Sequence, residues 1–411
     1  MKRGHLSQYF VGAAAKRLSA VDIDPARSNQ HEFGITRPML DFIGSPDEPT
    51  QYPASFAYFP ADGSEPTTDE AWLTIYDSRA NNPNRGPEYR GYYPSNEATS
   101  LAREGDMLVI AQPRDEHRLL VLIAEQGSVE TQRLSYLFGF EEPGQRFQSV
   151  SEEHLDSSRG LLDFTSKHIL ELLGITADKP DADVDLLDEM RSRFGEQFPD
   201  TRTFSAWARS TVQGVDPVGD PDTALISWVE QEEQLFFLFE KHLLAQALRE
   251  EFQEGAIDVD RFIKLSLSVH NRRKSRAGHS LELHMEAILR ANGIPFTRNG
   301  ITENRSKPDF VFPSIEAYHS LGFPSEKLFM LGAKSTLKDR WRQVLAEAAK
   351  ITRKHLLTLE PGLSSMQLAE IKASQVQLVV PMPLQGVYPE ESREQLQSLA
   401  DFIAEMKDHG E

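Results

Sequence analysis

"KPDFVF" at residues 307–312 and "KLFMLGAKSTLKDRWRQVLAEAAK" at residues 327–350 decide the fold of the C-terminal part of this chain. Each word contains a short apolar run of the kind that forms a buried strand. The second run leads into a segment crowded with charge, and the sequence predicts a helix there over residues 339–359. A third strand-like run, "VQLVVP", follows at residues 376–381. Helices that alternate with strands predict an α/β domain.

Charged side chains stand where these two strands begin and end. Asp309 lies at the start of the first strand, Lys334 at the end of the second, and Glu347 thirteen residues later on the predicted helix. An Asp and a Glu can hold Mg²⁺ through oxygen ligands, and the metal polarises a phosphate and lowers the pKa of a bound water. A nearby lysine can orient that water and offset charge in the transition state. The set suits hydrolysis of a phosphodiester.

Each of these residues also has a structural explanation. Pro-Asp is a common turn dipeptide, Lys334 could be the polar end of a buried strand, and Glu347 could belong to a solvated helix face. Each residue alone is more often structural than catalytic. Their order and their places on these elements together favour catalysis.

Asp339 and Arg340 are adjacent residues that could read DNA bases. Arginine can form a bidentate bond to guanine, and aspartate can accept a hydrogen bond from the amino group of cytosine. The alternative is a helix start with Asp339 near the N-cap and exposed arginines after it. Taken by themselves, these residues favour the alternative.

The overall composition limits the class of protein. The chain has 411 residues, 39% of them hydrophobic, which is enough for two or three packed domains. The absence of cysteine excludes disulfides and thiolate metal sites and fits a reducing cytoplasm. No apolar run approaches membrane-spanning length, so no membrane association is expected. The basic start is interrupted by Lys16 and Arg17, so we expect no signal peptide.

The formal net charge of −19 argues against nucleic-acid binding, but the distribution of this charge along the chain does not. Residues 181–260 carry a local balance of −13, whereas residues 264–307 and 327–354 each carry +6. These two basic blocks could attract a polyanion, because the local field governs such binding.

The pattern of elements predicts two domains. Residues 1–173 contain short β-branched and aromatic runs between turn residues, which predicts a β-rich barrel. An acidic, proline-bearing segment at residues 174–188 predicts a linker. Residues 189–411 read first as helices and then as the α/β domain. One of these helices is expected to have Ser280 as its N-cap and to stop at Asn292-Gly293.

Several long segments of the C-terminal domain resemble, in the same order, segments of a known protein family. They are "SVHNRRKSRAGHSLELHMEAIL", "KPDFVFPSIEAYHS", "KDRWRQVLAEAAK" and "VQLVVP". Over roughly residues 190–411 the chain resembles the catalytic domain of EcoRII-type restriction endonucleases. These are PD-(D/E)xK nucleases in which the usual glutamate beside the lysine has moved to the next helix. The resemblance implies a central mixed sheet flanked by helices.

The resemblance also implies roles for individual residues. Gly332 stands at the position where the general motif has an acidic residue. Glu347 would be the glutamate that has moved to the next helix. Asp309, Lys334 and Glu347 would be catalytic, with Mg²⁺ on Asp309 and Glu347. Glu282 matches an additional acidic position near the metal; a solvated helix residue paired with Glu286 is the alternative. The residues implied as readers of C·G pairs are Lys338, Asp339 and Arg340.

Two N-terminal words resemble the effector domain of the same family, a pseudobarrel similar to plant B3 DNA-binding domains. They are "YFVGAAAKRLSAVDIDPARSNQHEFG" and "IYDSRANNPNRGPEYRGYY". The resemblance places Arg17 and His31 on one recognition arm. The other arm would carry Arg85, Glu88 and Arg90. The basic and aromatic second word suits phosphate and base contacts, and an exposed hairpin tip is the alternative.

The expected protein is therefore a type IIE restriction endonuclease. It would be a homodimer that cuts double-stranded DNA at a palindromic CCWGG-like site, and its N-terminal domain would be autoinhibitory until it binds effector DNA. A second hypothesis is a nicking enzyme or recombinase with Tyr318 as nucleophile and Arg272, Arg273 and His319 around it. A non-catalytic DNA-binding regulator and a repair nuclease without sequence specificity are further alternatives.

Overall fold

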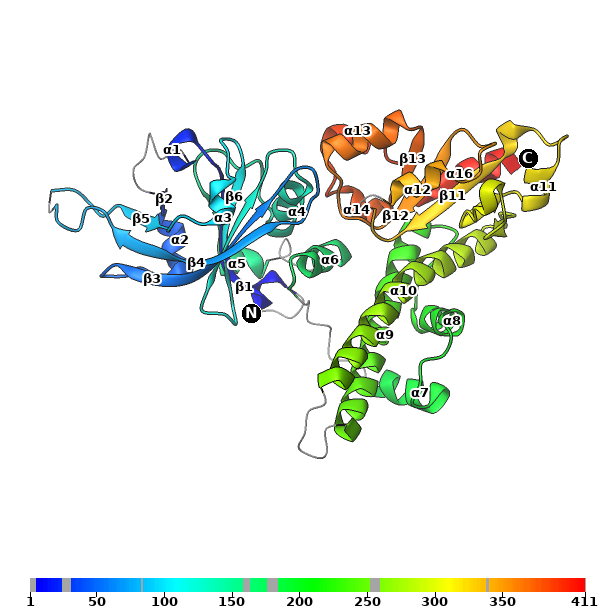
Figure 1. Ribbon diagram of the computed structural model, residues 1–411, viewed down its shortest axis with the longest axis horizontal. Coiled ribbons are helices and arrows are strands. Elements are labelled where there is room, and N and C mark those ends of the chain that lie inside the picture. Colours follow the sequence, from blue (N-terminus) through cyan, green and yellow to red (C-terminus); the bar gives the residue numbers. More distant parts are fainter. Residues whose placement is uncertain are drawn as a thin grey trace. The chain divides into compact units, whose positions relative to one another are not determined.

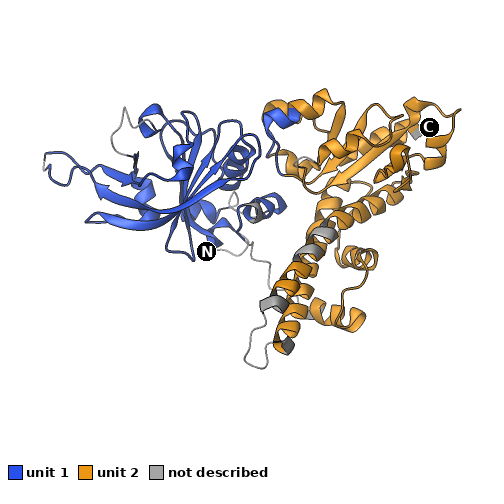
Figure 2. Cartoon of the chain, viewed as in Figure 1, with its two compact units in different colours: residues 1–177, 361–368, 387–389 blue, residues 178–360, 369–386, 390–411 orange. Residues whose placement is uncertain are grey.

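The chain divides into two compact units (Figure 2). Unit 1 comprises residues 1–177 with the short segments 361–368 and 387–389, and unit 2 comprises the remainder. The computed structural model describes residues 5–23, 31–82, 84–157, 163–175, 184–251, 259–337 and 340–410. The boundary between the units falls within the expected linker 174–188, of which residues 176–183 lie outside the described part. Among the described helices, none has both the length and the apolar character that crossing a membrane requires.

Unit 1 is built on one eight-stranded sheet. Its strands are β1 (Phe10–Arg17), β2 (Glu32–Gly34), β3 (Thr50–Phe59), β4 (Thr67–Asp77), β5 (Tyr89–Tyr92), β6 (Met107–Pro113), β7 (Leu119–Ala124) and β8 (Gln148–Val150). Their order in the sheet is β2-β5-β4-β3-β7-β6-β1-β8. Neighbouring strands are antiparallel except for the parallel pair β3 and β7. The edge strands β2 and β8 leave the sheet open, which is how a pseudobarrel differs from a closed barrel.

Both faces of the central strands are covered, because successive side chains of a strand point to opposite faces. In β1, Ala13 and Ala15 belong to one buried cluster, and Ala14 belongs to the other. The short helices of this unit are η1 (Leu6–Gln8), α1 (Ala20–Ile23), α2 (Arg37–Ile43), α3 (Glu97–Ser100), α4 (Val129–Phe138), α5 (Glu152–Leu155) and α6 (Phe164–Leu172). The curled sheet, blue and cyan in Figure 1, confirms the expected β-rich fold of this part of the chain.

Unit 2 begins with helices and ends in an α/β region. The four helices before the sheet are α7 (Val184–Phe194), α8 (Thr201–Thr211), α9 (Pro221–Glu251) and α10 (Val259–Ala291). An aromatic cluster that includes Phe204, Trp207 and Phe239 joins α7, α8 and α9. The two long helices α9 and α10 pack against each other, and α10 also contacts the sheet (Figure 1).

A mixed five-stranded sheet forms the rest of unit 2. Its strands are β9 (Thr297–Arg298), β10 (Phe310–Phe312), β11 (Phe329–Lys334), β12 (Lys354–Thr358) and β13 (Val376–Val379). They lie in the order β13-β12-β11-β10-β9, with β11, β12 and β13 parallel and the other pairs antiparallel. The remaining helices are η3 (Glu303–Arg305), α11 (Ile315–His319), η4 (Ser325–Lys327), α12 (Trp341–Leu345), α13 (Ser365–Ala373), α14 (Met382–Gln385), α15 (Glu390–Arg393) and α16 (Leu399–Gly410). The expected mixed sheet flanked by helices is confirmed.

Two predicted helix boundaries are wrong. The helix expected over residues 339–359 is only α12, and the chain then turns at Ala348, whose φ of +46° is left-handed. The buried run that follows forms β12, because its backbone pairs with β11 and β13. Ser280 is not an N-cap, since α10 begins at Val259 and Ser280 is buried within it. The predicted stop at Asn292-Gly293 is confirmed.

Candidate active site

The antiparallel pairing of β10 and β11 brings Asp309 and Lys334 together. Phe310 pairs with Leu331, so Asp309, directly before β10, reaches the end of β11. One carboxylate oxygen of Asp309, Oδ2, accepts hydrogen bonds from the backbone N–H of Ala333 at 2.7 Å and from Lys334 Nζ at 2.8 Å. Asp309 is buried and the Lys334 side chain is partly exposed. A fixed carboxylate therefore orients an ammonium group that solvent can still reach.

Glu347 joins this pair through its charge. It lies in the bend just after α12. The prediction that Glu347 lies on a helix is therefore wrong. Burial raises the pKa of Glu347, the negative charge of Asp309 raises it further, and Lys334 and Lys354 oppose this shift. The structure thus brings the three residues Asp309, Lys334 and Glu347 into one electrostatic neighbourhood.

Lys354 is a residue of this neighbourhood that the sequence analysis missed. Its Nζ donates to the backbone carbonyl of Glu347 and to that of Ala348, the latter at 3.4 Å. Lys354 is buried, and burial lowers its pKa. The lysine fixes the bend that presents Glu347. No sequence signal marked it, because it stood in a segment predicted to be helical.

Packing around Gly332 leaves little room for a side chain at this position of β11. A Cβ atom at this position would lie 3.0 Å from Cγ2 of Val344 and 3.3 Å from Cδ1 of Leu356. A larger side chain at residue 332 would therefore require Val344 of α12 and Leu356 of β12 to shift. Glu347 lies instead beyond the C-terminal end of α12, where the charge of Asp309 contributes to its raised pKa.

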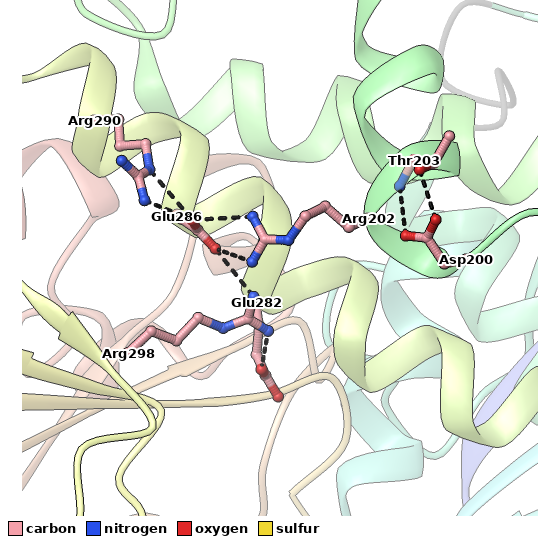
Figure 3. A network of polar contacts seen from close by, with 7 residues as sticks. All are labelled: Asp200, Arg202, Thr203, Glu282, Glu286, Arg290 and Arg298. Atoms are coloured by element: carbon pink, nitrogen blue, oxygen red, sulfur yellow. Dashed lines mark hydrogen bonds and ion pairs between the residues drawn. The ribbon is translucent and has the colours of Figure 1, made fainter.

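Glu282 belongs to a separate network of polar contacts on α10 (Figure 3). It pairs with Arg298 of β9, which also reaches Glu286 at 3.0 Å. Arg202 and Arg290 bind Glu286 as well, at 3.1 and 2.9 Å. In the described part of the chain, no three His, Asp or Glu side chains are grouped so as to hold a metal. The structure therefore pairs Glu282 with Arg298, and it does not assemble a site of three carboxylates among the described residues.

Asp309 and Glu347 are the residues here that could hold a metal. Both offer carboxylate oxygens, which are the ligands that Mg²⁺ prefers. Repulsion from Asp309 contributes to the raised pKa of Glu347, and a divalent cation between the two carboxylates would relieve that repulsion. The donor set thus fits a hard divalent ion.

Arg340 is an exposed residue at the N-terminal end of α12. Its backbone N–H donates to the carbonyl of Leu337 at 2.6 Å. Lys338 and Asp339, the other two residues expected to read bases, lie outside the described residues. Their role stays a prediction.

The residues around Tyr318 do not form a nucleophilic site. Tyr318 is buried, and its hydroxyl donates to Glu303 at 2.5 Å. Burial and this hydrogen bond raise its pKa to about 12, which disfavours the phenolate that would attack phosphorus. Arg273 is paired with Glu240, and Arg272 lies over the ring of Phe198.

Unit 1 holds the other residues expected to contact DNA, and three of them are already paired or partly buried. Arg90 on β5 binds Glu88 at 3.0 Å and Glu32 at 3.1 Å. Arg79, which the sequence analysis missed, pairs with Glu88. Arg17 donates to the carbonyl of Gly105, and burial lowers its pKa.

The two remaining residues lie elsewhere in unit 1. Arg85 is exposed in the connection between β4 and β5. His31 packs edge-on against Tyr93. The structure thus brings Glu88 and Arg90 into direct contact, whereas Arg17 contacts Gly105 and His31 contacts Tyr93.

Comparisons with known proteins match part of this chain. Residues 236–403 match the family described as EcoRII C terminal. This match confirms the resemblance seen in the sequence of that region. The chain is also 48% identical over 188 residues to the type II restriction enzyme EcoRII of Escherichia coli. That alignment spans 46% of this chain and 46% of the relative, so about half of the relative's length is matched.

Two solved structures also resemble the chain. A metal-depleted Ecl18kI in complex with uncleaved, modified DNA has a TM-score of 0.43 and 18% identity, covering 55% of this chain and 84% of its own. A complex of the restriction endonuclease PspGI with substrate DNA has a TM-score of 0.39 and 14% identity, covering 55% of this chain and 92% of its own.

Proposed function

We propose that this chain is a type II restriction endonuclease that cuts both strands of DNA by Mg²⁺-dependent hydrolysis. The observation that carries the proposal is the contact of Lys334 with the buried Asp309, with Glu347 electrostatically coupled to both. The family match of residues 236–403 and the identity to a restriction enzyme support it.

In the proposed reaction, each residue of the site has a separate role. Asp309 and Glu347 would hold Mg²⁺, which when bound polarises the scissile phosphate and lowers the pKa of a bound water. Asp309 also holds the Lys334 ammonium beside this position. Lys334 would orient the attacking water and offset the negative charge that develops on the phosphate oxygens. Lys354 would keep the bend of Glu347 in place.

Specificity would come from the segment after β11. Lys338, Asp339 and Arg340 would read C·G pairs in the major groove, where guanine offers two acceptors to arginine and cytosine offers a donor to aspartate. A homodimer would place two such segments on a palindromic site, because two-fold symmetry in the protein matches two-fold symmetry in the DNA. We expect a CCWGG-like site and a cytoplasmic enzyme.

Unit 1 would bind a second, effector copy of the site through Arg17, His31, Arg85, Glu88 and Arg90. Glu88 and Arg90 lie in contact, so a base-reading pair would be preorganised there. Until effector DNA is bound, this unit would restrain cleavage by the other.

The test is incubation of the whole chain with plasmid DNA and Mg²⁺, followed by sequencing of the ends. Discrete, recurring ends with C·G pairs at the flanks support the proposal. Random ends would indicate a nuclease without sequence specificity. A covalent protein–DNA adduct would indicate a tyrosine nucleophile. Binding without cleavage would indicate a regulator.

A further inference from the structure

The carboxyl ends of β11 and β12 lie side by side, because these strands are parallel. Lys334, the last residue of β11, pairs with Thr358, the last residue of β12. The chain leaves β11 toward Leu337 and Arg340, and it leaves β12 toward Glu360. Whatever follows β12 is therefore placed to contact the segment that follows the catalytic lysine.

Glu360 makes this contact. One oxygen of its carboxylate, Oε2, accepts a hydrogen bond from the backbone N–H of Leu337 at 2.9 Å. Glu360 is 6% exposed and Leu337 is fully buried. The backbone N–H of Glu360 in turn donates to the hydroxyl of the buried Thr358 at 3.0 Å. This bond holds the backbone of Glu360 against the end of β12, and the side chain extends from there to Leu337.

The Leu337 backbone is held at both of its polar groups. Glu360 binds its N–H, and its carbonyl accepts the N–H of Arg340. Lys338 and Asp339 lie between these two anchored residues in the sequence. Burial of a carboxylate costs free energy that its hydrogen bonds must offset, and a charged acceptor forms a stronger bond to a backbone N–H than a neutral one. Such an anchor suits a segment whose position must be exact to a fraction of an ångström.

We propose that Glu360 is a positioning residue for sequence recognition, acting on Arg340 through the backbone of Leu337, whose carbonyl accepts the N–H of Arg340. The inference rests on the proposed function. Bidentate contacts to bases require the donor within about 0.5 Å of its productive position. Lys334 has its own anchor in Asp309, so loss of the Glu360 contact should affect discrimination between sites more than hydrolysis itself.

The contact is tested first in the DNA-free whole chain by hydrogen–deuterium exchange of a peptide containing Leu337. E360A removes the acceptor, whereas E360Q retains an acceptor oxygen. E370Q is the matched control, because Glu370 binds the exposed Arg342 of α12 and does not touch Leu337. We expect faster exchange in E360A than in the wild type, E360Q and E370Q. Unchanged exchange in a folded E360A would overturn the inference.

The role in recognition is tested next on two duplexes. One carries the site that the wild-type chain cleaves, and the other carries the same site with a single G·C pair exchanged. The ratio of initial cleavage rates should fall roughly tenfold in E360A and stay near the wild-type value in E360Q and E370Q. If E360A does not fold, E360D replaces it, because its side chain is one methylene shorter. An unchanged ratio, or an equal slowing on both duplexes, overturns the inference and leaves the nuclease proposal intact. A wild-type chain that cuts neither duplex overturns both.

Discussion

At the residue scale, the proposed catalytic group consists of Lys334, the buried Asp309 that binds it, and Glu347, whose pKa responds to both charges. D309A removes a metal ligand and the anchor of Lys334, so we expect cleavage to fall by orders of magnitude while DNA binding persists. K334A should lose cleavage as well. E347A should do the same, since Glu347 would supply the second carboxylate of the proposed metal site. Plasmid cleavage and gel-shift binding, measured on the same preparations, check these outcomes.

A matched control for these variants is E326A, which removes an exposed carboxylate shortly before β11. It should cut at the wild-type rate. Full activity of E347A would show that another carboxylate, with Glu282 as the first candidate, completes the metal site.

Arg340 offers a second prediction at the residue scale. R340A should lower discrimination at one G·C pair by about 1–3 kcal/mol, because a bidentate contact to guanine is lost. Binding to unrelated DNA should weaken much less. The measurement is the dissociation constant for the cognate duplex and for duplexes with one exchanged pair, at a single salt concentration. Equal weakening on every sequence would mean that Arg340 binds phosphate and reads no base.

At the scale of elements, Glu286 ties α10 to α8 through Arg202 and to β9 through Arg298, and it also binds Arg290 of its own helix (Figure 3). Burial alone would raise the pKa of Glu286, but hydrogen bonds from Arg202, Arg290 and Arg298 outweigh it and lower the pKa to about 2. A depressed folded-state pKa means that this carboxylate stabilises the fold above its unfolded value of 4.5. That stability is lost as the pH falls from there toward about 2.

E286Q should therefore unfold at a lower urea concentration than the wild type at pH 7, and the gap should narrow as the pH falls below 4.5. Urea unfolding of both proteins at pH 7, 4.5 and 3 measures the effect. The same substitution at the exposed Glu326 should produce no gap at any pH. A constant gap for E286Q would show that its cause is packing and not charge.

At the scale of the whole molecule, control by effector DNA requires a population shift. Effector DNA must bind the cleavage-competent form better than the restrained form, or it changes nothing. We expect slow cleavage of a one-site plasmid, faster cleavage of a two-site plasmid, and stimulation by a short duplex that carries the site. A fragment of about residues 185–411 should cut the one-site plasmid at least as well as the whole chain. Equal rates in every case would remove autoinhibition and leave the nuclease proposal standing.

The sequence by itself determined the order of strands around Asp309 and Lys334, since short apolar runs between breakers specify strands locally. It also determined the β-rich nature of unit 1 and the long helix α9. The stretches that resemble the restriction-endonuclease family also indicated Glu347. These features depend on neighbours along the chain, which a pattern can reveal.

Only the tertiary structure decided what depends on neighbours across the chain. The run at residues 354–358 is a strand because β11 and β13 offer it backbone partners on both sides, although its own pattern also suits a helix. Lys354, Glu360 and Arg298 acquired their roles in the same way. Each is an ordinary charged residue in the sequence, and the fold places it beside a specific carbonyl, amide or carboxylate, because an unpaired buried charge would be too costly there.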